Sequence, residues 1–244
     1  MDMDFTGKTV IITGAAKGSP GIGYATALLF AENHANLVAV DIDEAKLASL
    51  EKDLAAGGEK VMSRVCDVGD EARVNEVVQE AICNFGKVDI LVNNAGIYKE
   101  DRTSFADSKS GAWKKKIDVN ILGTMYFTHA VINNMIENQY GRIINIASVA
   151  GVYGLRNMVD YSMTKGAVIA FTKALSKETG PFGITVNAVS PGDITDTRRV
   201  SDMSFLGRSG TPQECASLIC FLASDDAGYI SGQNYQIDGS RRTM

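Results

Sequence analysis

A tyrosine and a lysine four residues apart, Tyr161 and Lys165, are the side chains in this sequence best suited to proton transfer. They stand at the start of a segment with helical periodicity, where this spacing places the phenol and the ammonium on one face. A free phenol titrates at about pH 10, too high for a base at neutral pH, and a neighbouring ammonium lowers that pKa. The pair therefore predicts an acid/base centre, although the same spacing also occurs in exposed surface pairs.

A serine hydroxyl precedes the pair, at the end of an apolar segment that closes with Ile146-Ala147-Ser148. Transfer of a hydride to a carbonyl leaves an alkoxide that needs a proton, and the reverse reaction needs the alcohol proton removed. A hydroxyl aimed at the same oxygen would orient the carbonyl and stabilise the developing charge. Ser148, Tyr161 and Lys165 together are suited to the interconversion of an alcohol and a ketone.

A glycine-rich stretch joins the first expected strand to the first expected helix, Thr13-Gly14-Ala15-Ala16-Lys17-Gly18-Ser19-Pro20-Gly21-Ile22-Gly23. Glycines allow a tight turn and let a pyrophosphate approach main-chain N–H groups at a helix N-terminus without meeting a Cβ. The position between strand and helix favours a dinucleotide site over an ordinary turn. We expect Gly14, Gly21, Ile22 and Gly23 to contact the phosphates.

The second expected strand ends in an acidic residue, Asp41, about 20 residues beyond the glycines. A carboxylate there accepts hydrogen bonds from the ribose hydroxyls of the adenosine and repels a 2′-phosphate, which favours NAD over NADP. Lys17 in the glycine loop points the other way, because a cation there could pair with a 2′-phosphate. Its alternative interpretation is an exposed loop lysine.

Short apolar segments alternate with longer segments of helical periodicity along the whole chain. This alternation predicts an α/β, doubly wound Rossmann fold, a seven-stranded parallel sheet with helices on both faces, in a single domain over residues 1–244. The expected strands are Thr9–Thr13, Leu37–Asp41, Lys60–Arg64, Asp89–Asn93, Arg142–Ala147, Thr185–Ser190 and Asn234–Asp238. The expected helices are Ile22–Asn33, Glu44–Leu54, Glu71–Phe85, Trp113–Glu137, Ser162–Thr179 and Gln213–Leu222. Two polar stretches, Tyr98–Ser110 and Asp193–Gly210, are expected to be loops that line a site.

Composition excludes several other classes of protein. The 244 residues carry a formal net charge of −5, which argues against binding to nucleic acid or to an anionic membrane. The cysteines and histidines are few and scattered, so we expect neither a metal site nor a disulfide framework: Cys66, Cys83, Cys215, Cys220, His34 and His129. No apolar run approaches the roughly 18 residues of a membrane span, and the acidic N-terminus does not resemble a signal peptide. We therefore expect a cytoplasmic protein.

In this order, the motifs resemble those of the short-chain dehydrogenase/reductase family over almost the whole chain. The family's Thr-Gly-x-x-x-Gly-x-Gly motif resembles Thr13-Gly14 followed by Gly21-Ile22-Gly23, with six rather than three residues between Gly14 and Gly21. The resemblance implies that Asp67 and Val68 contact the adenine and that Asn94, Ala95 and Gly96 close the fourth strand. It also implies that Pro191, Gly192 and Ile194 receive the nicotinamide carboxamide. Relatives usually carry a threonine five residues after that proline, where this chain has Asp196 between Thr195 and Thr197.

The resemblance further implies a catalytic set of four residues, Asn120, Ser148, Tyr161 and Lys165. Asn120 would hold a water of the proton relay, and Lys165 would also hydrogen-bond the nicotinamide ribose. For Asn120 the alternative is a buried amide that merely interrupts a helix. The family also implies a homotetramer, with a dimer as the second choice.

The pocket for substrate is expected along Ile97–Ser104, Val149–Val159 and Asp193–Phe205, which mix polar and apolar residues. This mixture favours a small polar hydroxylated molecule such as a polyol, cyclitol or sugar derivative. The leading hypothesis is an NAD(H)-dependent secondary-alcohol dehydrogenase. One alternative is a 3-oxoacyl-[acyl-carrier-protein] reductase-like enzyme using NADPH, against which Asp41 counts. The other is a non-catalytic dinucleotide-sensing protein, against which the intact tyrosine and lysine count.

Overall fold

The computed structural model describes residues 3–18, 21–55, 61–98 and 103–242. Its seven strands form one parallel sheet in the order β3-β2-β1-β4-β5-β6-β7. They are β1 (Thr9–Thr13), β2 (Asn36–Asp41), β3 (Val61–Val65), β4 (Ile90–Asn93), β5 (Gly141–Ile146), β6 (Ile184–Pro191) and β7 (Asn234–Ile237). The strand order reverses between β1 and β4, which is where ligands bind in open α/β sheets. The predicted doubly wound parallel sheet is confirmed.

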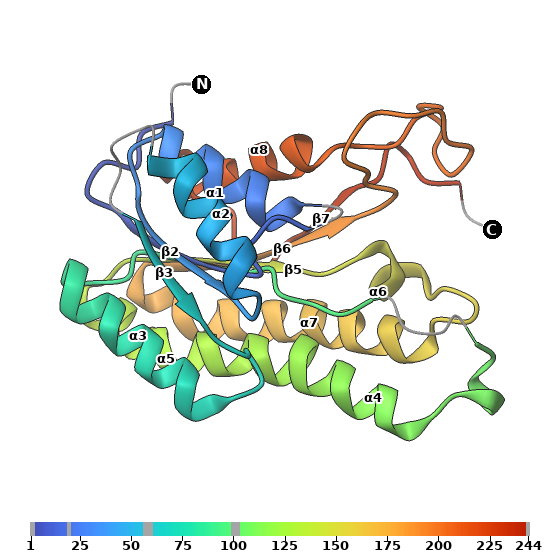
Figure 1. The fold of residues 1–244 in the computed structure, drawn as a ribbon, viewed down its shortest axis with the longest axis horizontal. Helices are drawn as coiled ribbons and strands as arrows, with labels where there is room; N and C mark the ends of the chain where they lie inside the picture. The colour runs from blue at the N-terminus through green and yellow to red at the C-terminus, as the bar shows by residue number, and fades with distance from the viewer. Residues whose placement is uncertain (1–2, 19–20, 56–60, 99–102, 243–244) are drawn as a thin grey trace.

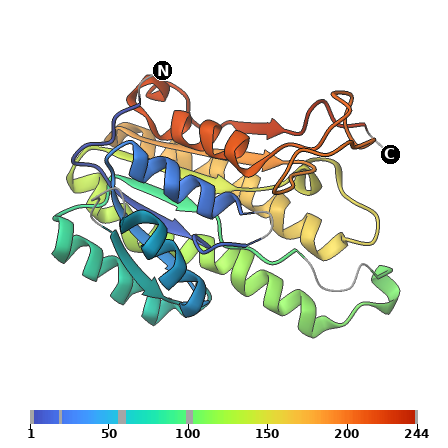
Figure 2. The ribbon, with the colours of Figure 1, turned by 45° about the horizontal axis from the view of Figure 1, so that its top comes forward.

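Helices cover both faces of this sheet (Figure 1 and Figure 2). One face carries α1 (Ile22–Glu32), α2 (Glu44–Ala55) and α8 (Pro212–Ala223). The other carries α3 (Glu71–Phe85), α4 (Ser110–Ile117), α5 (Gly123–Glu137) and α7 (Val159–Thr179). The short α6 (Val149–Tyr153) follows β5, and single 3-10 turns occupy Phe105–Asp107, Gly180–Phe182 and Asp225–Ala227.

The core consists of two apolar layers separated by the sheet. Alternate side chains of β1 enter opposite layers, since successive residues of a strand point to opposite faces. Val10 and Ile12 pack in the layer that holds Phe30 of α1, and Ile11 packs in the layer that holds Phe127 of α5. All five residues of β1 are buried, as expected for a central strand covered on both faces.

One predicted helix, Trp113–Glu137, differs in the structure. It begins earlier, at Ser110, and it is divided by a π-helical turn over Asp118–Leu122, in which the Gly123 N–H bonds to the Asp118 carbonyl. A turn of this kind adds one residue to the helical repeat and often lies at a functional site. Side-chain periodicity does not reveal it, because the flanking helices continue in nearly the same direction.

A second difference concerns the region after β5. A short helix that the sequence does not predict forms over Val149–Tyr153, where the Ser148 hydroxyl caps it by accepting the Ala150 N–H at 3.1 Å. Helix α7 then begins at Val159 rather than Ser162, which makes Tyr161 its third residue. The remaining strand and helix ends agree with the predictions to within one residue, and Lys60 of the third expected strand lies outside the described residues.

Candidate active site

A cleft of about 820 Å³ opens at the carboxyl ends of the central strands. Its walls contain every residue that the sequence assigned to the coenzyme, together with three of the four expected catalytic residues. These lining residues are Gly14, Lys17, Gly21, Ile22, Gly23, Asp41, Asp67, Val68, Asn94, Ala95, Gly96, Ser148, Tyr161, Lys165, Pro191, Gly192 and Ile194. Asn120 is fully buried behind this wall. The structure thus brings segments that are far apart in the chain around one space.

The first and last glycines of the loop after β1 have no room for a side chain. Gly14 has a φ of +64°, and a Cβ there would lie 2.9 Å from the Ala95 Cα. A Cβ at Gly23 would lie 2.1 Å from the Gly14 carbonyl oxygen. By contrast, a Cβ at Gly18 would meet nothing closer than 3.9 Å. Close backbone packing therefore depends on the two outer glycines, and Ser19 and Pro20 of this longer loop lie outside the described residues.

The glycine loop is fastened to the end of β4 by Asn94 and Thr13. The Asn94 side-chain amide donates to the Thr13 and Gly14 carbonyls at 3.0 and 2.8 Å. In return, the Thr13 hydroxyl accepts the N–H groups of Asn94 and Ala95, each at 3.0 Å. These four bonds give Asn94 a role that its motif alone did not explain, because they hold two walls of the cleft together.

The N-terminus of α1 faces the cleft through Gly21, Ile22 and Gly23. Gly21 caps the helix without any side-chain hydrogen bond, and the first turn holds no acidic residue. The free N–H groups and the positive end of the helix dipole suit an anion. A pyrophosphate group fits this glycine-lined cradle, so the residues present match a nicotinamide dinucleotide.

Asp41 lies at the end of β2 with its carboxylate held by the backbone. Its two oxygens accept the N–H groups of Ala16 at 3.0 Å and Asp43 at 3.1 Å. A carboxylate has further lone pairs, which leaves acceptors for ribose hydroxyls. Lys17 is exposed, and its ammonium lies 5.4 Å from the centre of the Tyr24 ring. Lys46, which also lines the cleft, pairs with Asp43 at 2.7 Å.

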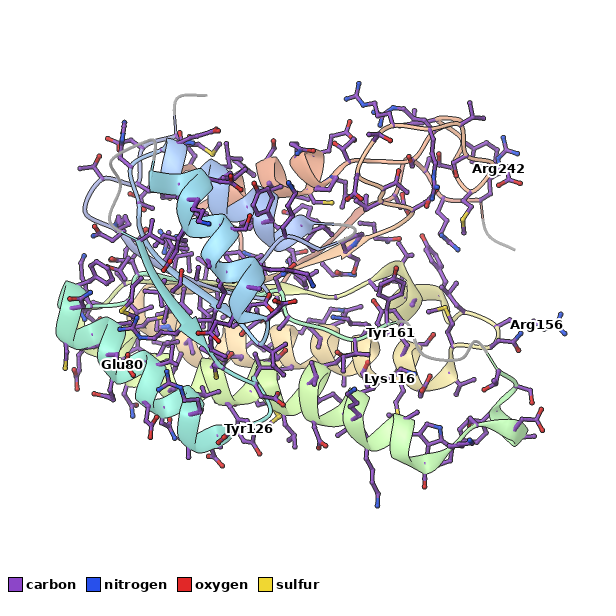
Figure 3. The ribbon with its side chains drawn as sticks, in the orientation of Figure 1. Glu80, Lys116, Tyr126, Arg156, Tyr161 and Arg242 are labelled. Atoms are coloured by element: carbon purple, nitrogen blue, oxygen red, sulfur yellow. The ribbon has the colours of Figure 1, made fainter. Side chains whose placement is uncertain are left out.

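Tyr161 projects from the first turn of α7 into the same cleft as Ser148 (Figure 3). Burial raises the pKa of its phenol, a hydrogen bond with Ser148 opposes the rise, and Tyr98, whose ring centre lies 6.3 Å away, adds to it. The expected net fall of this pKa is not found. Desolvation is the largest influence, and the direction is upward.

Lys165 is 4% exposed, and its ammonium donates to the Ile146 carbonyl at 2.6 Å, at the end of β5. The ammonium lies 5.9 Å from the centre of the Tyr161 ring. Burial lowers the pKa of Lys165 from 10.5 to about 8. The side chain therefore carries a positive charge at neutral pH, but it holds its proton much less tightly than an exposed lysine does.

Asn120 lies in the π-helical turn and joins three segments. Its amide oxygen accepts the Ile97 N–H at 2.8 Å, and its amide nitrogen donates to the Ile97 carbonyl and the Thr164 hydroxyl, both at 3.0 Å. A Cβ at Gly96 would lie 3.3 Å from both the Asn120 oxygen and the Lys165 nitrogen. Asn120 is thus placed behind Lys165, with its hydrogen-bonding groups engaged by the chain.

The substrate end of the cleft agrees only in part with the expected segments. Residues of all three segments line it, among them Tyr98, Leu155, Met158, Asp193 and Met203, whereas Val152, Tyr153, Arg156 and Phe205 lie outside the lining. Arg102 lies outside the described residues. Of the two threonines beside Asp196, Thr195 lines the cleft and Thr197 does not.

Sequence reasoning missed some lining residues, including Cys66, Lys46 and Arg241. Cys66 directly precedes Asp67 after β3, so its position beside the Asp67-Val68 motif could have predicted that it lines the cleft. Arg241 lies outside every motif, so no local pattern placed it at the cleft. A backbone bridge between Ser204 and Arg241 brings it to the cleft.

Within the described ranges, no group of three or more His, Cys, Asp or Glu side chains could hold a metal ion, and the four cysteines are free. None of the helices in the described part of the chain is long and apolar enough to cross a bilayer.

Comparison with known proteins gives consistent matches. Residues 14–240 match the family model described as enoyl-(acyl carrier protein) reductase. The chain is 39% identical to a 3-oxoacyl-[acyl-carrier-protein] reductase of Thermotoga maritima, over 97% of this chain and 98% of that protein. It is also 39% identical to a (2S)-[(R)-hydroxy(phenyl)methyl]succinyl-CoA dehydrogenase subunit of Thauera aromatica, over 98% of each. Among solved structures, an NAD+-bound xylitol dehydrogenase superposes with a TM-score of 0.90 at 31% identity, over 97% of this chain and 99% of that one.

Proposed function

The chain belongs to the short-chain dehydrogenase/reductase family, and from this premise we propose that it is an NAD-dependent dehydrogenase that interconverts a secondary alcohol and a ketone on a small polar substrate. As a family member it is an NAD(P)-dependent oxidoreductase acting on CH–OH groups. The observation that carries the finer proposal is that Ser148, Tyr161 and Lys165 share one cleft with the glycine loop and Asp41.

The chemistry assigned to each residue follows from its surroundings. The bound nicotinamide supplies or accepts the hydride. The Ser148 hydroxyl and the Tyr161 phenol both hydrogen-bond the substrate oxygen, which orients the carbonyl and stabilises charge that develops on it. Because burial raises the pKa of Tyr161, the phenol is protonated at neutral pH and can donate its proton to the alkoxide formed on reduction.

In the oxidative direction the phenol must first lose its proton. The Lys165 charge, 5.9 Å from the ring centre, favours the phenolate in this state. Asn120 fixes Ile97 and Thr164 on either side of the lysine and so acts as a positioning residue. Whether it also holds a water of a proton relay stays a prediction.

A panel of secondary alcohols and ketones, including polyols, tests the activity through the absorbance of the reduced nicotinamide. We expect turnover by the wild type and a loss of about 10²-fold or more in Tyr161→Phe, which keeps the ring but removes the transferable proton. If Tyr161→Phe matched the wild type across the panel, the catalytic assignment would be refuted.

The preference for NAD is supported by Asp41 and by the similarity to an NAD+-bound xylitol dehydrogenase. A fixed carboxylate at the adenosine ribose repels a 2′-phosphate. Calorimetric titration with both coenzymes should show tighter binding of NAD by the wild type. Asp41→Ala should weaken the binding of NAD and reduce the difference in affinity between NAD and NADP. Tighter binding of NADP than of NAD by the wild type would overturn this part of the proposal.

A second candidate is the reduction of a 3-oxoacyl group carried on a larger thioester. Its support is the 39% identity to a 3-oxoacyl-[acyl-carrier-protein] reductase over nearly the whole chain. Acetoacetyl thioester offered with NADH and with NADPH separates the two candidates. Efficient reduction of the thioester with NADPH, together with no turnover of any polyol in the panel, would favour this second function.

We further propose that residues 1–244 act as one dinucleotide-binding and catalytic domain, which assembles as a homotetramer in the cytoplasm. The exposed Met125 of α5 and Met163 of α7 lie on helices that pair across subunits in the family. Light scattering on the purified protein tests the assembly, and a monomer would contradict it.

A further inference from the structure

Two arginines, Arg199 and Arg241, line the active-site cleft on the side formed by the last strands. Arg199 lies in the loop that follows β6, and Arg241 follows β7. These strands occupy the opposite edge of the sheet from β2, whose end carries Asp41. Both residues therefore line the cleft on the side away from Asp41, which we take as the substrate side.

We infer that the substrate carries an anionic group, a carboxylate or a phosphate, and that Arg199 and Arg241 bind it. This inference rests on the proposed function, because it assigns the substrate class of the same site.

The C-terminal segment is fixed along the loop by backbone hydrogen bonds. The Phe205 N–H donates to the Ser240 carbonyl at 2.9 Å, and the Arg242 N–H donates to the Met203 carbonyl at 3.0 Å. Ser204 and Arg241 form an antiparallel bridge between these bonds. Arg241 therefore leaves the backbone from a defined position beside the cleft, rather than from a frayed end.

Arg199 is anchored in the same way on the other strand of the loop. Its N–H donates to the Ser209 hydroxyl at 3.2 Å, and its carbonyl accepts the Ser209 N–H at 3.0 Å. Val200 bridges to Arg208 immediately beyond this pair. These contacts hold the base of the Arg199 side chain, while the guanidinium is left to reach a ligand.

Two other arginines of the same loop show the contrast. Arg198 and Arg208 both bind the Glu214 carboxylate, at 2.9 and 2.8 Å, and these contacts, Arg208 foremost, lower the pKa of Glu214 to about 2. Arg199 and Arg241 make no ion pair with any described carboxylate. The loop thus pairs Arg198 and Arg208 with Glu214, and none of the ion pairs among the described residues involves Arg199 or Arg241, the two arginines that line the cleft.

One carboxylate of the same loop, Asp193, also lines the cleft. Its carboxylate accepts the Ser201 hydroxyl at 2.7 Å, and no ion pair among the described residues joins it to Arg199 or Arg241. Farther out, Arg242 packs over the Phe205 ring at 4.9 Å, and Figure 3 shows Arg156 across from it at the same end of the molecule.

An arginine cannot lose its proton, so a substrate that covers these groups must supply acceptors for their N–H donors. The planar fork of a guanidinium matches the two oxygens of a carboxylate or phosphate. A hydroxy acid, an oxo acid or a phosphorylated polyol meets this requirement, and a neutral polyol does not.

Ligand-observed NMR with NAD-loaded Tyr161→Phe measures binding without turnover. The probes are matched pairs, 3-hydroxybutanoate with its methyl ester and glycerol 3-phosphate with glycerol. We expect at least one anion to bind about 10-fold or more tightly than its neutral partner, which is the scale of a charge-assisted hydrogen bond. Adding Arg199→Gln or Arg241→Gln should remove that preference, whereas Arg198→Gln, whose charge Glu214 already neutralises, should retain it.

The inference is overturned if neither anion binds more tightly than its neutral partner, or if the preference survives both substitutions. A loss of NAD affinity in Arg199→Gln or Arg241→Gln would also overturn it, because it would assign the guanidinium to the coenzyme. A failure of the proposed function is distinguishable, since it would appear as no turnover of any alcohol or ketone by the wild type while the binding preference is still measured.

The source of the anion is decided by a separate arm. Acetoacetyl-CoA carries its phosphates on the carrier, and acetoacetyl-N-acetylcysteamine is the same thioester without them. If Arg199 and Arg241 bind a carrier phosphate, their loss should reduce kcat/KM for the first compound only. If they bind a group on the substrate itself, loss of Arg199 or Arg241 should reduce kcat/KM only weakly, and by the same factor for both thioesters.

Discussion

Replacing the buried lysine of the active site should stabilise the protein while removing its activity. Lys165→Met keeps an unbranched side chain of similar length in the same space and deletes the charge. The change separates the effect of Lys165 on activity from its effect on stability. The positive charge assists proton transfer, but its burial away from water destabilises the fold.

The magnitude follows from the pKa of Lys165. Its fall from 10.5 to about 8 corresponds to ~3 kcal/mol by which the fold disfavours the charged form. Methionine removes this penalty at neutral pH but leaves the Ile146 carbonyl without the hydrogen bond that the ammonium gave it, which costs about 1 kcal/mol. The net expectation is a gain of ~2 kcal/mol, or roughly 4–8 °C in Tm for a chain of this size.

The gain should depend on pH in a defined direction. Below the folded pKa of about 8, both the folded and the unfolded wild type hold the proton, and the full penalty applies. Between about 8 and 10.5 the folded protein loses the proton first, so the wild type gains stability as pH rises. Above 10.5 both states are neutral and the penalty is gone.

The assay is chemical denaturation of wild type and Lys165→Met at neutral pH and at a pH above this window, at one protein concentration because assembly also contributes stability. Lys173→Met, an exposed lysine on the same helix, is the matched control and should change stability little at either pH. The reasoning is refuted if Lys165→Met is less stable than the wild type at neutral pH, or if its advantage does not shrink as pH rises.

Three further changes test other parts of the structure. Gly23→Ala places a Cβ 2.1 Å from the Gly14 carbonyl and should weaken NAD binding about 10-fold or more by calorimetry, whereas Gly18→Ala, with nothing closer than 3.9 Å, should have little effect. Thr211→Ala removes the N-cap of α8, whose hydroxyl accepts the Glu214 N–H, and should cost about 1 kcal/mol of unfolding free energy in denaturant; an unchanged midpoint would contradict the cap. Asn120→Ala leaves the backbone groups of the part-buried Ile97 and the hydroxyl of the buried Thr164 without this partner and should cost about 1–3 kcal/mol in the same assay, and no loss would show that water replaces the amide.

Much of the fold and most of the site could be predicted from local patterns. The alternation of strand and helix periodicities indicated the parallel sheet, because each period records which faces an element buries. In a parallel sheet the loops after successive strands meet at one edge, so motifs placed after β1, β2, β3, β4 and β6 had to converge. The glycine loop, Asp41 and the Tyr161 and Lys165 pair all lie in the cleft that this rule predicts.

The remaining features depend on contacts between distant segments. The direction of the Tyr161 pKa was wrong in the sequence analysis because residue spacing describes the neighbouring charge but not the burial that outweighs it. In the π-helical turn at Asp118–Leu122, the Asn120 side chain hydrogen-bonds Thr164 of α7. Hydrophobic periodicity along the chain does not reveal a contact of this kind with a distant segment.

The sequence by itself therefore determined the residues able to do the chemistry and the strand ends that carry them, since composition, spacing and periodicity are properties of short stretches. Only the tertiary structure decided which charges those residues meet. Arg241 reaches the cleft through a bridge to Ser204, and Glu214 neutralises Arg198 but not Arg199. The electrostatics of a site are set by solvent exclusion and by partners far away in the chain, and both exist only once the sheet has brought those segments together.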